Sequence, residues 1–266
     1  MKRHFHKMHG LGNDFVIIDA RQEPFDVTPT LARAIADRRT GVGCDQLIVL
    51  EPSGTADLRM RIWNGDGGEV ESCGNATRCV IQLTGARTID SDGGLLEGED
   101  FGAEVEVSLG QPHFGWDEIP LAYAMDTASL PMAWNGLEHP MALNVGNPHL
   151  VFFVPDAREV PLQDIGPSIE NDAAFPERIN VNVATYVDGR LKLRTFERGA
   201  GETLACGTGA CASAVAAIAT KRAQSPVTVD MTGGSLTVSW VPGEPIRMRG
   251  AATLVFEGEL ELEALR

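Results

Sequence analysis

The stretch LRMRIWNGDGGEVESCG, residues 58–74, is matched by LKLRTFERGAGETLACG, residues 191–207. The two stretches align without a gap at an offset of 133 residues, which is half the chain length of 266. A second match lies near the same offset and pairs GNDFV at 12–16 with GNPHL at 146–150. The economical explanation is that the chain consists of two similar halves, each about the size of a domain.

The two halves also share a local order of strand, turn and helix. Residues 58–63 and 191–196 alternate apolar with polar side chains, as half-buried strands do. In each half a glycine-rich turn and a Cys-Gly pair follow the strand, and helices are predicted at 75–84 and at 208–220. Asn75 and Thr208 are residue types favoured at helix starts, so we expect the helices to begin there.

Strands outnumber helices in the rest of the chain. Each half is therefore expected to be an α+β domain, a mixed and mostly antiparallel sheet wrapped around one central helix. The two domains should be pseudo-symmetric, with the active site in the cleft between them and a hinge at 111–120, where Pro and Gly occur. Further strands are predicted at 15–19, 46–50, 104–109, 150–154, 182–187, 227–231, 236–240 and 253–257.

One cysteine precedes the central helix of each half, Cys73 in the first and Cys206 in the second. A thiol at this place is close to the positive end of the helix dipole and to unpaired amide hydrogens, so we expect its pKa to fall below the free value of about 8.5. Across a pseudo-twofold axis, one thiolate could remove a proton from a carbon while the other thiol protonates its opposite face. That operation inverts a stereocentre, and the helix starts would stabilise the enolate-like charge.

A free cysteine is more often a small buried residue, but its repetition at the same place in both halves favours chemistry. Cys79 and Cys211 lie six and five residues further along the helices and point elsewhere, so they are interpreted as structural thiols. This spacing also disfavours metal chelation, because two ligands on one helix need the i,i+4 spacing. We therefore expect no metal site, and we place Cys44 in a polar turn without a partner.

Two kinds of cofactor-dependent protein are disfavoured. The run GTGACA at 207–212 formally matches the dinucleotide fingerprint, but the preceding strand ends near residue 196, too early for the glycine to form its turn. A pyridoxal phosphate racemase needs a Schiff-base lysine, and none of the lysines lies in a phosphate-binding context. The lysines are Lys2, Lys7, Lys192 and Lys221. We expect a reaction that needs no cofactor.

The composition narrows the class of partner. The formal net charge is -15, from 22 basic and 37 acidic side chains, which argues against nucleic acid and anionic membranes as partners. No apolar run reaches the roughly 18 residues of a membrane-spanning helix, and His9, Asn13 and Asp14 interrupt the stretch after the basic start. Five cysteines without a disulfide spacing indicate reduced thiols. We expect a cytoplasmic protein with a small-molecule substrate.

The sequence resembles the diaminopimelate epimerases from Met8 to about Gly258. The resemblance implies that the strand after residue 252 returns to the first domain, which gives domains of 1–110 plus 252–266 and of 111–251. The motifs that carry it are GLGNDF (10–15), GVGCDQ (41–46), NGDG (64–67), CGN (73–75), GNPH (146–149), FPERIN (175–180), ERGAGET (197–203) and ACGTG (205–209).

The resemblance implies an isomerase that interconverts LL- and meso-diaminopimelate for lysine and peptidoglycan precursor biosynthesis. Cys206 would accept the proton from the LL isomer and Cys73 would donate one, while His149 and Glu197 adjust the thiol pKa values. The reacting carboxylate would lie at the two helix starts, on Gly74, Asn75, Gly207 and Thr208. The remaining substrate contacts would come from Asn13, Gln46, Asn64, Asn147, Asn180, Glu197 and Arg198, with Arg198 on the distal carboxylate.

The family implies a homodimer, and Phe256 stands where many members have a tyrosine thought to support dimerisation. Taken singly, the substrate residues have ordinary interpretations: Asn13 and Asn147 as turn residues, Gln46 as a solvated strand residue, Glu197 with Arg198 as a surface ion pair, and His149 as a satisfied polar residue. Three other functions stay open. They are a racemase of another amino acid on the same fold, a thiol redox or metal-binding protein, and a non-catalytic binding protein.

Overall fold

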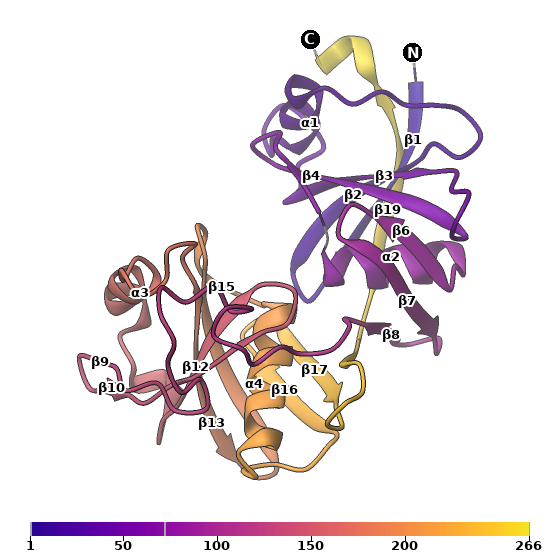
Figure 1. Ribbon diagram of the computed structural model, residues 1–266. Helices are drawn as coiled ribbons and strands as arrows, with labels where there is room; N and C mark the ends of the chain where they lie inside the picture. Colours follow the sequence, from indigo (N-terminus) through magenta and orange to yellow (C-terminus); the bar gives the residue numbers. More distant parts are fainter. Residues whose placement is uncertain (1, 72, 266) are drawn as a thin grey trace. The chain divides into compact units, whose positions relative to one another are not determined.

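The computed structural model describes residues 2–71 and 73–265 and divides into two compact units (Figure 1). One unit comprises the chain up to Val107 together with the segment from Gly250 onward, and the other runs from Ser108 to Arg249. None of the helices among the described residues is both long and apolar enough to cross a membrane.

In the first unit, β2 lies antiparallel to β1 and parallel to β3, β3 is antiparallel to β4, and β4 is parallel to β6. Strands β5, β7 and β19 add antiparallel to β4, β6 and β1. The elements are β1 (Lys2–Gly10), β2 (Asn13–Asp19), α1 (Pro29–Ala36), β3 (Gln46–Glu51), β4 (Leu58–Asn64), β5 (Glu69–Val70), α2 (Gly74–Thr84), β6 (Thr88–Ser91), β7 (Gly94–Asp100), β8 (Val105–Ser108), β19 (Thr253–Glu261) and the 3₁₀ turn η2 (Leu262–Leu265).

The second unit repeats this arrangement strand for strand. Its β12 is antiparallel to β11 and parallel to β13, β13 is antiparallel to β14, and β14 is parallel to β16 and antiparallel to β15. The elements are β9 (Ala133–Trp134), β10 (Leu137–Glu138), β11 (Met141–Asn144), β12 (Pro148–Phe153), η1 (Ala157–Glu159), α3 (Leu162–Glu170), β13 (Asn180–Val187), β14 (Arg190–Glu197), β15 (Gly201–Thr203), α4 (Gly207–Ala219), β16 (Val227–Met231), β17 (Gly234–Ser239) and β18 (Arg247–Gly250).

The predicted two-fold repeat and the mixed, mostly antiparallel sheets are confirmed. The register also repeats: Phe15 pairs with Gln46 where β2 meets β3, and His149 pairs with Asn180 where β12 meets β13. Both pairs are related by the same shift along the chain. A sequence repeat that preserves strand register places equivalent side chains on the same face in both units.

The central helix predicted for each unit is present as α2 and α4, and each unit has one further helix, α1 or α3, that was not predicted. Helix α2 contacts β1, β2 and β7, and α4 contacts β11 to β14, β16 and β17 (Figure 1). The additional helix α1 buries Ala32 and Ile35 in an apolar cluster with Val16, Leu47 and Trp63. Helix α3 buries its apolar face in the matching cluster of the second unit. These helices are short, with eight residues in α1 and nine in α3.

The predicted elements fall at the observed places, with local corrections. The helices predicted at 75–84 and 208–220 are α2 and α4, and each predicted strand overlaps an observed one. The prediction that Asn75 and Thr208 start the helices is wrong, because Cys73 and Cys206 are the N-cap residues. Cys44 does not lie in a polar environment either, since it is buried in the cluster under α1.

Candidate active site

Both repeated cysteines cap the helix that follows them. The backbone is extended at Cys73 (φ −151°, ψ 112°) and at Cys206 (φ −121°, ψ 110°), as is usual for an N-cap residue. Gly74 and Gly207 are the first residues of α2 and α4, so their amides belong to the helix end that lacks partners within the helix. Each unit therefore presents a thiol and a set of N–H donors at one helix N-terminus, where negative charge is stabilised.

In the first unit, a chain of hydrogen bonds leads from the α2 core to the thiol. The Arg78 guanidinium, fully buried, donates to Oδ1 of Asn75 at 2.7 Å, and the Asn75 amide donates to Oδ1 of Asn13 at 3.2 Å. The Cys73 thiol donates to the same oxygen at 3.8 Å. Asn13 is fixed in turn because its amide donates to Asp45 at 3.0 Å. Asn13, Cys73 and Asn75 therefore form one cluster.

The tight turn between β1 and β2 places Asn13 at this point. Leu11 and Gly12 have φ values of 56° and 90°, as a two-residue type I′ hairpin turn requires. Gly10 precedes the turn, and a Cβ there would lie 3.1 Å from Nη2 of Arg78 and 3.2 Å from Cβ of Asn75. The glycines of the GLGNDF motif thus allow the turn and the close approach of β1 to α2.

Gln46 and Asn64 form a second pair at facing positions of β3 and β4. The Gln46 amide donates to Oδ1 of Asn64 at 2.9 Å. Oε1 of Gln46 is buried, and no donor reaches it from the residues that the structure describes. A buried carbonyl oxygen without a donor costs about 1–3 kcal/mol of folding free energy. A ligand with N–H groups, such as an ammonium, would remove that cost.

In the second unit, the Cys206 thiol is buried beside the Glu197 carboxylate. Burial raises the pKa of the Cys206 thiol well above its ordinary value, and the charge of Glu197 raises it further. The Thr208 hydroxyl, 3.5 Å from Sγ, and the Gly209 amide, 3.3 Å from Sγ, act in the opposite direction. The expected fall in pKa is therefore not found at Cys206, because loss of hydration outweighs the helix end.

Replacing Glu197 by glutamine is expected to lower the pKa of Cys206, because a neutral amide does not repel the thiolate. The thiolate can be titrated as the ultraviolet difference between the protein and its Cys206→Ala variant. The transition should move to lower pH in Glu197→Gln. It should stay in place in Glu202→Gln, since Glu202 pairs with Arg194 instead. An unchanged transition in Glu197→Gln would mean that Glu197 does not act on this thiol.

His149 is fully buried on β12 with both ring nitrogens hydrogen bonded. The Asn182 amide, a donor, lies 3.0 Å from Nδ1, and Oδ1 of Asn147, an acceptor, lies 2.8 Å from Nε2. These partners place the proton on Nε2. Burial, aided by the charge of Arg198, lowers the pKa of His149 to about 3. His149 is therefore neutral at physiological pH and orients Asn147, and it cannot adjust a thiol pKa through charge.

Asn180 and Arg198 are joined by a backbone contact. The Arg198 N–H donates to Oδ1 of Asn180 at 2.9 Å, and the Asn180 amide donates to the Pro148 carbonyl at 2.8 Å. Asn180 is buried, so its side chain ties β13 to the segments on either side. The Arg198 guanidinium, which is partly exposed, donates to the Glu177 carbonyl at 3.0 Å. A planar guanidinium that reaches solvent is suited to a carboxylate.

The other cysteines are structural, as the sequence indicates for Cys79 and Cys211. Both are fully buried within α2 and α4. Burial raises the pKa of Cys79 to about 12 and that of Cys44 to about 11. None of these three cysteines is the N-cap residue of α2 or α4, which distinguishes them from Cys73 and Cys206.

Comparison with known proteins identifies the family of the chain. The family model described as diaminopimelate epimerase matches residues 5–114 and 141–255. The chain belongs to the diaminopimelate epimerase family. It is 60% identical over 267 residues to the diaminopimelate epimerase of Rhizorhabdus wittichii, covering 99% of this chain and 97% of the relative. It is also 60% identical over 264 residues to that of Sphingopyxis alaskensis, covering 98% of each.

Solved structures with low sequence identity to this chain show the same fold. The PhzF-family phenazine biosynthesis protein of Bacillus anthracis has a TM-score of 0.69. The match covers 98% of this chain and 99% of that protein. Its sequence identity is 18%, so the likeness concerns the fold alone. The resemblance inferred from the motifs is thereby confirmed for the family and for the fold class.

Several supporting residues were not among the predicted site residues. Arg78 holds Asn75, Asn182 holds His149, and Thr203 donates to Glu197. Asn182 is itself held by the Thr195 hydroxyl, which donates to its Oδ1 at 2.9 Å. Asn180 and Asn182 are two residues apart on β13, which begins before the strand predicted at 182–187, and that spacing places both on one face. Arg78 lies one helical turn from Asn75.

Proposed function

We propose that the protein interconverts LL- and meso-diaminopimelate by proton transfer at one α-carbon, with Cys206 and Cys73 as the acid/base pair and without a cofactor. The observation that carries the proposal is the repeat itself: both units place a cysteine at the N-cap of the equivalent helix. A reaction that must act on two faces of one carbon needs two such groups. The family membership and the names of the curated relatives support the same reaction.

The proposed step transfers one proton to Cys206 and one proton from Cys73. The Cys206 thiolate takes the α-proton of the LL isomer, and the electrons of the C–H bond delocalise into the carboxylate. The Cys73 thiol then protonates the opposite face and becomes a thiolate. Glu197 lies beside Cys206, so it is placed to accept the thiol proton that burial holds on the sulfur. The amides at the starts of α2 and α4 stabilise the enolate-like charge.

The proposed substrate contacts follow from the polar groups of each unit. Oε1 of Gln46 and the neighbouring Asn64 would accept from the distal ammonium, because Oε1 has no donor among the described residues. Arg198 would bind the distal carboxylate. Asn13, Asn75, Asn147 and Thr208 would position the reacting end, and Asn180 would hold the Arg198 backbone.

The proposed setting is a homodimer in the cytoplasm, in lysine and peptidoglycan precursor biosynthesis. Strand β19 exposes Leu254, Val255 and Phe256 in succession, with Phe256 48% exposed. Exposed apolar residues that lie together support a protein interface on this strand. The proposed domain limits are 1–110 plus 252–266 and 111–251.

The test is incubation of the reduced, metal-free protein with LL-diaminopimelate in deuterated water, followed by proton NMR. Deuterium should enter the α-position together with formation of the meso isomer. A panel of amino acids that lack either the distal amine or the distal carboxylate should react at least about tenfold more slowly, because a buried acceptor or Arg198 then stays unpaired. Equal reaction of the whole panel, or no reaction of diaminopimelate, would point to the racemase of another amino acid.

A further inference from the structure

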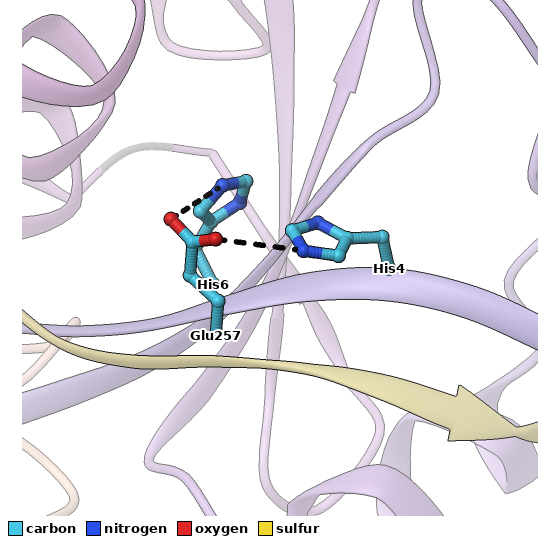
Figure 2. Close-up of side chains that lie close together, drawn as sticks. All are labelled: His4, His6 and Glu257. Carbon is cyan, nitrogen blue, oxygen red and sulfur yellow. Dashed lines mark ion pairs between the residues drawn. The ribbon is translucent and has the colours of Figure 1, made fainter.

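Strands β1 and β19 carry a cluster of side chains that are typical metal ligands. His4 and His6 are two residues apart on β1, so both project from the same face of the sheet. Glu257 on β19 pairs directly with His6 in the antiparallel register. Figure 2 shows the Glu257 carboxylate beside the two imidazole rings, with one ion pair to each. One ligand atom from each of the three residues lies within 4.8 Å of the other two.

The spacing of these atoms fits a shared ion better than direct hydrogen bonds. Nε2 of His4 lies 3.6 Å from Oε2 of Glu257, and Nε2 of His6 lies 3.5 Å from Oε1. Both distances exceed those of ordinary hydrogen bonds. Two ligands on one tetrahedral zinc ion lie about 3.3 Å apart, given bonds of about 2.0–2.2 Å. The two nitrogen–oxygen distances are therefore within a few tenths of an ångström of those around a zinc ion, and the three ligand atoms, which lie within 4.8 Å of one another, would draw together on binding.

The exposure of the cluster also suits a metal. Nδ1 of His6 is buried, so Nε2 is the nitrogen that faces the carboxylate. His4 and Glu257 have side chains 55% and 49% exposed, which leaves the ion a path from solvent.

The other acidic groups near the cluster have basic partners of their own. Glu259 pairs with Lys2 at 3.0 Å, and Asp19 pairs with Arg21 at 2.7 Å. Glu257 makes its ion pairs with the two imidazoles, among the residues whose placement is described. Because both imidazoles are weak bases, a divalent ion would neutralise this carboxylate more completely than they do.

We propose that His4, His6 and Glu257 bind a divalent transition-metal ion, for which zinc is the best fit, with water completing the coordination. Two imidazoles and one carboxylate are a common ligand set for zinc. The ion would clip β1 to β19 on the face opposite Phe5, whose ring meets Phe256. The cysteine spacing predicts no metal site. The His4-x-His6 pair becomes a candidate site only in the folded protein, where β19 places Glu257 beside it.

Zinc chloride should be titrated into the full chain carrying Cys73→Ala and Cys206→Ala, so that the proposed catalytic thiols do not compete for metal. One equivalent should bind. His4→Ala and Glu257→Gln should each weaken binding at least about tenfold. Glu259→Gln, on the same strand and face, is the matched control and should change affinity less than about threefold. Circular dichroism of each variant checks that it is folded.

A second measurement separates binding at this site from binding elsewhere. Zinc should raise the Tm of the parent chain and of Glu259→Gln, because the ion binds only the paired strands, and it should not raise that of Glu257→Gln. Unaltered zinc affinity in His4→Ala, or an equal loss in Glu257→Gln and Glu259→Gln, would overturn the proposal. So would the lack of any bound equivalent in the folded parent chain.

Discussion

Replacing Cys206 by alanine is expected to lower kcat for conversion of LL- to meso-diaminopimelate by at least about a thousandfold, within the range set by general acid–base groups. Glu197 is another ionisable group beside this buried thiol. It is not the N-cap residue of α4, so it cannot take the place of Cys206. Alanine also removes the acceptor that Sγ provides for the Gly209 amide, 3.3 Å away. The Cys73→Ala variant should lose inversion to a similar extent.

Isotope exchange can distinguish the roles of the two thiols. With Cys73→Ala in deuterated water, the LL isomer should exchange its α-hydrogen through Cys206 without forming the meso isomer. With Cys206→Ala, exchange should be confined to the opposite configuration. Cys79→Ala is the control, since this buried thiol on α2 takes no part in the proposed chemistry. Inversion at the parental rate in either active-site variant would disprove the two-thiol mechanism.

A Gly209→Ala substitution should destabilise the second unit and disturb the side chains around Cys206. The added Cβ would lie 2.6 Å from Oδ1 of Asn182, 2.8 Å from Oγ1 of Thr195 and 3.2 Å from Sγ of Cys206. The first two atoms are hydrogen bonded to each other at 2.9 Å, so neither can move without breaking that bond. Overpacking of this kind costs about 1–3 kcal/mol.

The Gly209→Ala variant should also lose more than about tenfold in kcat, because a misplacement of about 1 Å in a catalytic group has effects of that size or larger. Asn182 supports His149, and His149 supports Asn147. Urea unfolding measures the first effect and the deuterium assay the second. Gly54→Ala is the control, since a Cβ at Gly54 meets nothing within 4 Å. Equal stability and activity of the two variants would show that α4 has room at this position.

The fold was predictable because the two halves of the chain can be compared with each other. The matched stretches 58–74 and 191–207 identify the strand, the turn and the helix start together, and the register of the sheets preserves the match. Helices α1 and α3 escaped prediction because each covers only about two turns and neither belongs to the repeated stretches 58–74 and 191–207. Strand β1 was hidden by its charged outer face, where Lys2, His4 and His6 alternate with buried residues.

The sequence was sufficient to predict which residues belong to the candidate site. It was less informative about the role of each residue. Cys73 and Cys206 were indicated by position alone. The pKa of Cys206 was not, because burial depends on packing across α4 and β14 that the sequence does not display. The same applies to His149, whose neutrality follows from its burial and whose tautomer follows from Asn182 on a neighbouring strand. Interactions across strands become visible only once the register is known.

The way the first unit is assembled has a consequence for synthesis on the ribosome. Strand β1 precedes the entire second unit in the chain, whereas its partner β19 follows it. Residues 108–249 are contiguous, so the second unit can fold as soon as it has emerged. Until β19 appears, the nascent chain carries β1 with one edge unpaired, and its alternating Lys, Arg and His side chains discourage other strands from joining it. The basic side chains of β1 would thereby protect the incomplete chain from pairing with other strands during synthesis.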